Sequence, residues 1–148
     1  MTEPTPSTWI LDIVFRYKHS FGGRQPFFDA LLNRKMLASY CPRCARQWCP
    51  PRLRCPEDQR ATQWVELYGL GTVRYVTRGP GRDPMAESSD MRIWGLITID
   101  GCENSVIARI VPSRERVKAG DRVIMDSDRF DCMHPIQHLV FRCVEGDS

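Results

Sequence analysis

The amino-acid sequence predicts a mainly β protein with one helical segment near its N-terminus. Three observations lead to this fold class: an alternating apolar run over residues 9–17, four cysteines within fifteen residues, and a series of short β-rich runs after residue 64. Glycines interrupt the last series, and no long helical segment lies between its members. These runs therefore fit a small closed barrel of the OB type better than an α/β layer.

The length and composition are those of one folded domain with an appendage. The chain has 148 residues, of which 42% are hydrophobic and 26% charged, and this is too apolar for a disordered protein. No stretch approaches the roughly 18 consecutive apolar residues of a membrane helix. The first residues lack the basic and apolar regions of a secretory signal. We therefore expect a cytoplasmic protein with no membrane partner.

The net charge of +3 is too small to require a nucleic-acid partner. Its distribution is uneven, because residues 1–63 hold ten Lys/Arg and five Asp/Glu, whereas residues 64–148 hold eleven and thirteen. The basic excess therefore lies around the clustered cysteines. The seven cysteines are an odd number and cannot form a complete disulfide framework. Clustering without a secretion signal indicates a metal site instead.

Residues 1–39 are expected to form a strand and a helix. Alternate residues of the run 9–17 are apolar, which is the pattern of a strand: Trp9, Leu11, Ile13, Phe15 and Tyr17. After a turn at Gly22 and Gly23, Pro26 suits the first turn of a helix. Apolar residues then recur at helical spacing: Phe27, Phe28, Leu31, Leu32 and Leu37. The apolar face of this helix either packs on the rest of the chain or docks on a partner.

The barrel is expected over residues 64–148. Its predicted strands are Trp64–Leu67, Thr72–Thr77, Ile93–Ile99, Ser105–Val111, Asp121–Asp126 and Leu139–Val144. Gly69 and Gly71 lack the third glycine and the following helix of a dinucleotide-binding loop. We interpret them as backbone clearance at a corner of the barrel.

The cysteine cluster contains one complete metal-binding pair. Cys41-Pro-Arg-Cys44 has the spacing at which two thiolates bind one tetrahedral ion. The second pair is Cys55 with Asp58, since a carboxylate oxygen can also bind zinc. Cys49 is a competing fourth ligand, and a segment without metal is a third alternative. A redox dithiol would open a helix in a βαβ unit, whereas this motif follows a helix and precedes prolines.

Five motifs follow one another along the chain: Phe27-Phe28-Asp-Ala-Leu31-Leu32, Cys41-Pro-Arg-Cys44, Pro50-Pro51-Arg52, Cys55-Pro56 and Trp64-x-x-Leu-x-Gly69-x-Gly71-x-Val73-x-x-x-Thr77. In this order they resemble a family of small bacterial and archaeal proteins long classed as a domain of unknown function. The resemblance covers roughly residues 25–145. Two positions depart from the family pattern: Cys49 replaces an aromatic residue, and Asp58 replaces the usual fourth cysteine.

The resemblance implies an N-terminal helix, a rubredoxin-like zinc ribbon over residues 40–63 and a C-terminal OB fold. It also implies a partner subunit with a thiolase fold that acts on acyl-CoA and supplies the catalytic residues. The metal ligands would be Cys41, Cys44, Cys55 and Asp58. Guanidinium groups bind phosphates well, so four ribbon arginines could contact the CoA thioester: Arg43, Arg46, Arg52 and Arg54.

The sequence thus predicts a non-catalytic accessory subunit of an acyl-CoA enzyme complex that transfers acyl groups or cleaves carbon–carbon bonds. It would stabilise its partner and help to frame the CoA thioester. No catalytic residue is assigned, because the cysteine cluster has no neighbouring histidine and Cys102 lies in a glycine turn. We interpret the histidines as surface or partner-contact residues: His19, His134 and His138.

The alternative function is a single-stranded nucleic-acid-binding OB-fold protein. Such proteins combine arginines with aromatic side chains on which bases stack, and the candidates here are Tyr68, Tyr75 and Trp94. The barrel segment is net acidic, however, and a nucleic-acid groove should be the most basic part of the molecule. We therefore place nucleic-acid binding second.

Overall fold

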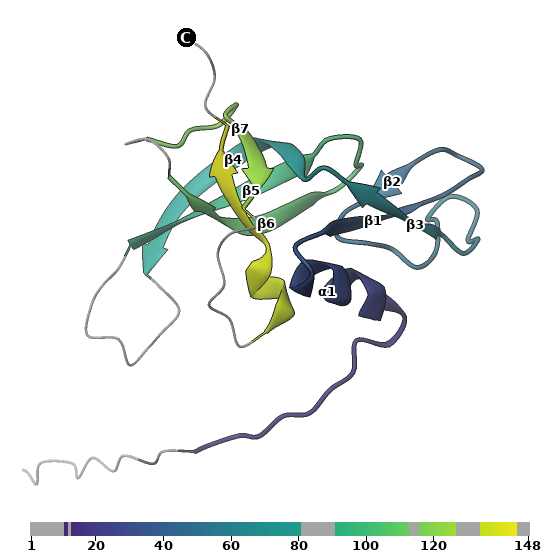
Figure 1. The fold of residues 1–148 in the computed structure, drawn as a ribbon, viewed down its shortest axis with the longest axis horizontal. Coiled ribbons are helices and arrows are strands. Elements are labelled where there is room, and N and C mark those ends of the chain that lie inside the picture. Colours follow the sequence, from purple (N-terminus) through teal and green to yellow (C-terminus); the bar gives the residue numbers. More distant parts are fainter. Residues whose placement is uncertain (1–10, 12, 81–90, 113–115, 127–133, 145–148) are drawn as a thin grey trace, which may run out of the picture.

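The computed structural model places a closed five-stranded barrel beside a three-stranded sheet (Figure 1). The structure describes residues 11, 13–80, 91–112, 116–126 and 134–144. The sheet has the order β2-β1-β3, and its strands are β1 (Met36–Tyr40), β2 (Gln47–Trp48) and β3 (Gln63–Leu67). The barrel has the order β4-β5-β6-β8-β7, and its strands are β4 (Leu70–Pro80), β5 (Met91–Ile99), β6 (Ser105–Val111), β7 (Arg122–Met125) and β8 (Val140–Cys143). The predicted mainly β class is confirmed.

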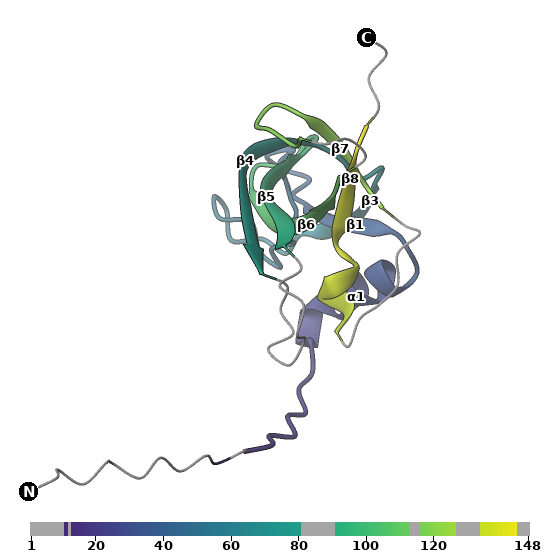
Figure 2. The same ribbon diagram turned by 90° about the vertical axis from the view of Figure 1, so that its left-hand side faces the viewer.

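The barrel closes because β8 lies between β6 and β7 (Figure 2). Its pairing with β6 is parallel, and the other barrel pairs are antiparallel. Alternate residues of β5 point into the barrel and are buried: Ile93, Gly95, Ile97 and Ile99. This period of two is the pattern by which the sequence predicted these strands.

Gly71 lies where β4 pairs with both β5 and β7, opposite Ile99 on one side and Val123 on the other. A Cβ atom at Gly71 would lie 2.8 Å from the Thr98 carbonyl oxygen. Any larger side chain would therefore clash with backbone. This finding supports the interpretation of Gly71 as clearance at a corner of the barrel.

The one α-helix among the described residues, α1 (Gln25–Leu32), follows the short 3₁₀ turn η1 (Gly22–Arg24) and packs within the chain. Phe27 and Leu31 are fully buried and belong to the same apolar core as the barrel residues, whereas Leu32 is half exposed. The helix ends before Arg34, whose φ of 62° is left-handed. Leu37 lies in β1 rather than in the helix. Of the two interpretations of this helix, the structure supports packing on the rest of the chain.

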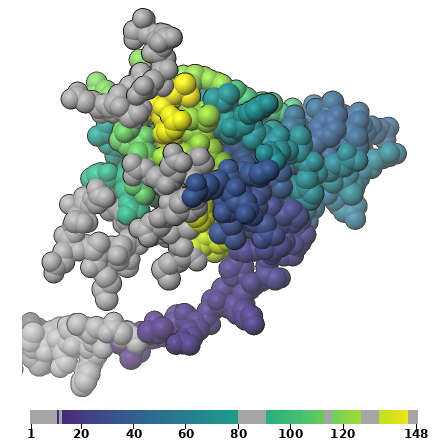
Figure 3. Space-filling view, viewed as in Figure 1, coloured from purple at the N-terminus to yellow at the C-terminus, as the bar shows by residue number. Residues whose placement is uncertain are grey.

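The predicted strand over residues 9–17 is wrong for the residues that the structure describes there. Leu11 and residues 13–20 form no strand and are all exposed, and this N-terminal arm runs away from the body of the molecule (Figure 3). An alternating pattern gives a strand only where a neighbouring strand pairs with its backbone. Within the described residues, the arm has no such neighbour. Trp9, Ile10 and Asp12 lie outside the described residues.

A second 3₁₀ turn, η2 (Pro135–His138), precedes β8 and meets α1 and the base of the arm. His134 caps this turn through its Nδ1 atom, which accepts the Ile136 N–H at 3.2 Å. Its ring stacks on His19 of the arm, with ring centroids 5.6 Å apart. His138 is buried, which corrects its interpretation as a surface residue. No helix in the described part of the chain is long and apolar enough to cross a membrane.

Candidate metal centre

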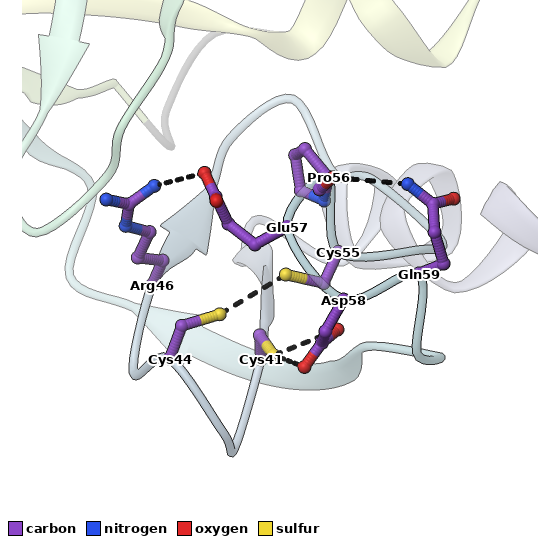
Figure 4. Close-up of polar contacts among 8 residues, drawn as sticks. All are labelled: Cys41, Cys44, Arg46, Cys55, Pro56, Glu57, Asp58 and Gln59. Atoms are coloured by element: carbon purple, nitrogen blue, oxygen red, sulfur yellow. Dashed lines mark hydrogen bonds and ion pairs between the residues drawn. The ribbon is translucent and has the colours of Figure 1, made fainter.

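Four side chains converge between two turns of the three-stranded sheet, one that begins at Cys41 and one that begins at Cys55 (Figure 4). We call these the cysteine turns. One ligand atom from each of Cys41, Cys44, Cys55 and Asp58 lies within 4.8 Å of all the others. The Sγ atoms of Cys44 and Cys55 are 3.2 Å apart, and Cys41 Sγ is 3.7 Å from Asp58 Oδ2. Three sulfurs and one oxygen at this spacing form a donor set that suits a tetrahedral metal ion such as zinc.

The two turns that carry these residues have the same backbone pattern. In the first, Cys41 N–H donates to the Arg46 carbonyl and Ala45 N–H donates to the Cys41 carbonyl, both at 2.9 Å. In the second, Cys55 N–H donates to the Arg60 carbonyl at 2.9 Å and Gln59 N–H donates to the Cys55 carbonyl at 3.0 Å.

The positions that correspond in the two turns also have the same unusual backbone angle. Ala45 and Gln59, each four residues after the first cysteine, have φ values of 54° and 58°. In this correspondence Asp58 matches Cys44, because each lies three residues after the first cysteine of its turn. Asp58 therefore occupies the fourth ligand position by the geometry of the turn as well as by its spacing.

Asp58 is held with one oxygen directed toward the cysteines. Its Oδ1 atom accepts the Arg60 N–H at 3.0 Å, while Oδ2 is the carboxylate atom nearer to Cys41. The Arg60 N–H holds the pKa of Asp58 below its usual range, so this carboxyl is ionised at neutral pH. A metal ion would therefore meet a carboxylate that is already charged and oriented.

The cysteine thiols of the cluster differ in acidity. A hydrogen bond from the Cys44 backbone N–H lowers the pKa of Cys41. The side-chain hydrogen bond between Cys44 and Cys55 raises the pKa of Cys44 to about 12, with smaller contributions from Cys41 and from burial. Metal binding would have to displace the Cys44 proton, so uptake should release protons.

The cluster is closed on one side and open on the other. Cys41 and Cys55 are completely buried and pack with Trp48. Cys44 and Asp58 are half-buried and line a hollow of about 450 Å³ together with Arg43 and Glu57. Small solutes can therefore approach the sulfur and carboxylate of this side directly.

Cys49 is not part of the cluster. It is completely buried in the main apolar core, whereas the other three cysteines of this segment form a separate cluster. Burial raises the pKa of Cys49 to about 12, and its backbone N–H donates to Asn104 Oδ1 at 2.7 Å. The structure thus does not support Cys49 as the fourth ligand.

The four arginines predicted to contact CoA are all exposed on the ribbon. Two of them interact with other ribbon residues: Arg46 forms an ion pair with Glu57 at 2.8 Å, and Arg54 donates a hydrogen bond to the Gln59 carbonyl at 2.9 Å. In the described part of the chain, no hydrogen bond is recorded from the guanidinium of Arg43 or Arg52. Arg43 is the arginine that lines the hollow over the cluster.

Cys49 of the main core and Cys102 of the barrel are not activated thiols. Burial raises the pKa of Cys102 to about 11, with the nearby charges of Asp100 and Glu103 adding to the effect. Cys143 is completely buried, and Cys132 lies outside the described residues. A protonated thiol is a poor nucleophile. Cys49 and Cys102 are therefore unsuited to covalent catalysis.

Comparison with known proteins finds relatives by structure only. No protein-family model and no curated protein match the sequence. Among solved structures, a protein of unknown function from the DUF35 family of Sulfolobus solfataricus matches with a TM-score of 0.61 and 19% identity, over 83% of this chain and 87% of that chain. A chain of the Ltp2-ChsH2(DUF35) aldolase matches with a TM-score of 0.62 and 18% identity, over 85% of this chain and 98% of that chain.

The fold is that of the DUF35 proteins. The resemblance that the sequence motifs indicated is therefore confirmed at the level of the DUF35 fold. One of these DUF35 neighbours belongs to an aldolase with a second named component.

Proposed function

We propose that this chain is a non-catalytic accessory subunit of a thiolase-like acyl-CoA enzyme complex. The observation that carries the proposal is the DUF35 fold shared over almost the whole length of a chain in the Ltp2-ChsH2(DUF35) aldolase. The thiolase fold of the partner and its acyl-CoA substrate come from the resemblance of the sequence motifs. In such a complex this chain stabilises its partner and contributes to the surface along which the CoA thioester lies.

The acidity of the thiols supports a role without covalent chemistry. The pKa values of Cys49 and Cys102 are about 12 and 11, so both side chains are protonated at neutral pH. Covalent catalysis by cysteine needs a thiolate or an adjacent base. Neither of these two thiols is therefore suited to be the nucleophile, and in this proposal the nucleophile of the complex belongs to the partner.

The metal has a structural role in this proposal. Cys41, Cys44, Cys55 and Asp58 hold a zinc ion that joins the two turns of the ribbon. A segment of this size has a small apolar core of its own, formed by two of these cysteines and Trp48. Metal–ligand bonds then supply much of the free energy that keeps the ribbon folded.

The ribbon arginines give the chain a means of contacting CoA. Arg43, Arg46, Arg52 and Arg54 are exposed, and guanidinium groups form charge-assisted hydrogen bonds with phosphate. A contact remote from the reacting thioester favours the ground state and the transition state equally. These arginines would thus help to bind the substrate without accelerating the chemical step.

We also propose that the protein works in the cytoplasm. Six described cysteines form no disulfide, including the two sulfurs that lie 3.2 Å apart in the cluster. Reduced thiols of this kind, and a metal site built from them, suit a reducing compartment.

Affinity purification of the tagged chain from its native host, followed by mass spectrometry, tests the proposal. We expect a thiolase-fold protein at a fixed stoichiometry, and acyl-CoA turnover by the assembled complex but not by this chain alone. Cys102→Ser, Cys132→Ser and Cys143→Ser should leave that turnover within a few-fold of the parent. A thousand-fold loss of kcat from one of these substitutions, in a complex that still assembles, would place the chemistry in this chain and refute the proposal.

A further inference from the structure

The outer surface of the barrel carries an apolar patch that no described residue of this chain covers. We call it the outer barrel face and define it by Tyr75, Trp94, Leu96, Ile107 and Ile136. Tyr75 and Ile107 are 73% and 74% exposed, and Ile136 of η2 is 38% exposed. Trp94 and Leu96 are half-buried beside them. Monomeric proteins seldom leave such a contiguous patch in water, so this face is a candidate contact surface.

The register of the sheet places these residues side by side. Leu96 of β5 lies opposite Tyr75 of β4 on one side and opposite Ile107 of β6 on the other. The three strands form one wall of the barrel (Figure 2). Alternate residues of β5 point into the core, and the packing of the barrel explains why these are apolar. Trp94 and Leu96 lie on the opposite surface of the strand, where packing within the barrel does not explain their apolar side chains.

The face is hollowed at two adjoining places. One hollow has a volume of about 170 Å³ and lies between Tyr75 and Trp94. The other has a volume of about 230 Å³ and lies between the strands and η2, with Ile136 in its lining. Trp94 and Ile107 line both. Each hollow is smaller than the roughly 300–1,000 Å³ of typical small-molecule sites, and it suits single apolar side chains of a docked protein.

The charge of this wall is entirely positive. Strands β4, β5 and β6 contain no aspartate or glutamate, and they contain four arginines: Arg74, Arg78, Arg92 and Arg109. Arg92 and Arg109 both line the larger hollow. The Nε atom of Arg92 is buried and has no hydrogen-bond partner among the residues that the structure describes. A buried donor of this kind is stabilised when a partner supplies an acceptor, and a carboxylate is the strongest.

The composition of the face favours a protein over a nucleic acid. Three of its five defining side chains are aliphatic, and nucleic-acid surfaces of OB folds rely on aromatic side chains that stack with bases. Tyrosine, tryptophan and arginine around an apolar centre are the residues that dominate the binding energy of protein interfaces. The apolar side of α1, the other candidate contact surface, is already buried in the core of this chain. The apolar residues of the N-terminal arm are exposed, but none of them lines either hollow.

We propose that the outer barrel face is the docking surface for the acyl-CoA enzyme subunit, which presents an apolar segment flanked by carboxylates. This inference rests on the proposed function, and it names the surface and the partner chemistry that the proposed function leaves open. The apolar segment fills the two hollows beside Trp94 and Ile107. The carboxylates pair with Arg92 at the edge.

Site-specific photocrosslinking in the native host tests this assignment. A photoreactive phenylalanine replaces Tyr75 or Ile107 in the tagged chain, and Tyr68 is the matched control because it is 95% exposed but lies before β4, outside the face. We expect the thiolase-fold protein in the products from positions 75 and 107, and not in those from position 68. Its capture from position 68 alone would overturn the docking face and leave the proposed function standing.

Other crosslinking results would also decide between the docking face and the proposed function. Crosslinks from the face only to nucleic acid or to a second copy of this chain, with no acyl-CoA enzyme captured from any position, would overturn both the docking face and the proposed function. Co-purification of the thiolase-fold protein with the unmodified chain, combined with no crosslink from positions 75 and 107, would overturn the docking face alone.

An affinity measurement gives a second, independent test. Ile107→Asp places a carboxylate in the centre of the face at an exposed position, where the fold should tolerate it. We expect it to reduce binding of the co-purified subunit by about tenfold or more, with an unchanged melting temperature. Tyr68→Asp should bind like the parent. Arg92→Gln should weaken binding at low salt more than at high salt, because an ion pair is screened. Unchanged binding by Ile107→Asp would refute the assignment.

Discussion

The backbone N–H of Cys49 donates a hydrogen bond of 2.7 Å to Oδ1 of Asn104, which lies in the turn between β5 and β6. Asn104 also donates from Nδ2 to the Pro50 carbonyl at 3.0 Å. Next to it, the Glu103 N–H donates to the Gln47 carbonyl at 2.8 Å. The cysteine-bearing sheet is therefore fixed to the barrel at the segment between its two turns, and Cys49 serves that contact.

Asp58 is the residue on which metal affinity should depend most. The purified chain should contain about one zinc ion, and Asp58→Ala should weaken its retention by more than about tenfold, equivalent to roughly 1.4 kcal/mol. Asp58→Cys should tighten retention, because a thiolate replaces a carboxylate in the fourth position. Metal analysis and competition with a chelator measure both effects.

Glu57→Ala is the matched control for Asp58, since Glu57 is the adjacent carboxylate and forms its ion pair with Arg46 outside the four-residue cluster. It should leave zinc retention unchanged. Less than half an equivalent of zinc in protein never exposed to chelator would contradict the assignment of this site.

Leu31 and Leu32 are neighbours in α1 that should differ sharply in their contribution to stability. Leu31 is completely buried in the main core, whereas Leu32 is 50% exposed. Leu31→Ala should reduce the free energy of unfolding by about 2–5 kcal/mol, and Leu32→Ala should reduce it by less than about 1 kcal/mol. Urea unfolding of the metal-loaded chain measures the difference. Equal, small effects would show that this helix does not pack in the core.

The ion pair of Arg122 with Asp100 should make a small part of the stability depend on pH. The hydrogen bond from Arg122 holds the pKa of Asp100 below its ordinary value, so the folded state binds this proton less tightly than the unfolded state. The ion pair therefore contributes fully to the free energy of unfolding above the pKa of Asp100 in the unfolded state, which is about 3.9. This contribution is lost as the pH falls through the lower pKa of Asp100 in the folded state.

Asp100→Asn tests this pH dependence while keeping a turn-forming residue. Both side chains are nearly half exposed, so the destabilisation at pH 7 should be below about 1 kcal/mol. It should disappear as the pH is lowered below about 4. Unfolding of the parent and the variant at several pH values gives the comparison, and Glu103→Gln is the control. A destabilisation that persisted at the lowest pH would assign the effect to the turn instead of the ion pair.

Arg43 is the ribbon arginine best placed to reveal a CoA contact, because it lines the open hollow and, unlike Arg46, forms no ion pair with another described residue. In the assembled complex, Arg43→Ala should raise the KM for acyl-CoA roughly three- to tenfold, a range reduced for its exposure, and leave kcat unchanged. Arg60→Ala on the same ribbon is the control. A fall in kcat with constant KM would indicate a role in the chemical step.

Five of the six predicted barrel strands could be found from the sequence because each has its own local pattern. The sixth, Trp64–Leu67, is wrong as a barrel strand, since it lies in β3 and pairs with β1 in the three-stranded sheet. The runs Ile93–Ile99 and Ser105–Val111 alternate between core and surface, and the structure gives β5 and β6 at nearly these bounds. The turns of the cysteine cluster were also predictable, since each begins with Cys-Pro and has its second ligand three residues after the first.

Other elements depend on contacts that no local pattern contains. Residues 13–17 alternate as a strand would but have no neighbouring strand among the described residues. In β1, Ala38 and Ser39 are both buried, so the strand shows no alternation, and Leu37 matched the helical spacing before it. The outer barrel face was only partly visible in the sequence. The sequence identified Trp94 and Tyr75 as aromatic residues that could bind a ligand. It gave no sign that the apolar Ile107 faces outward, because that depends on how the sheet is assembled.

The strand that closes the barrel is the last one in the sequence. β8 supplies a neighbour to both β6 and β7, so that β7 pairs with β4 alone until residues 140–143 arrive. The three-stranded sheet, by contrast, is complete by Leu67. On the ribosome, where a chain emerges from its N-terminus, the protein can therefore assemble its cysteine turns while its barrel is still open. The order of synthesis places the metal centre before the closed barrel.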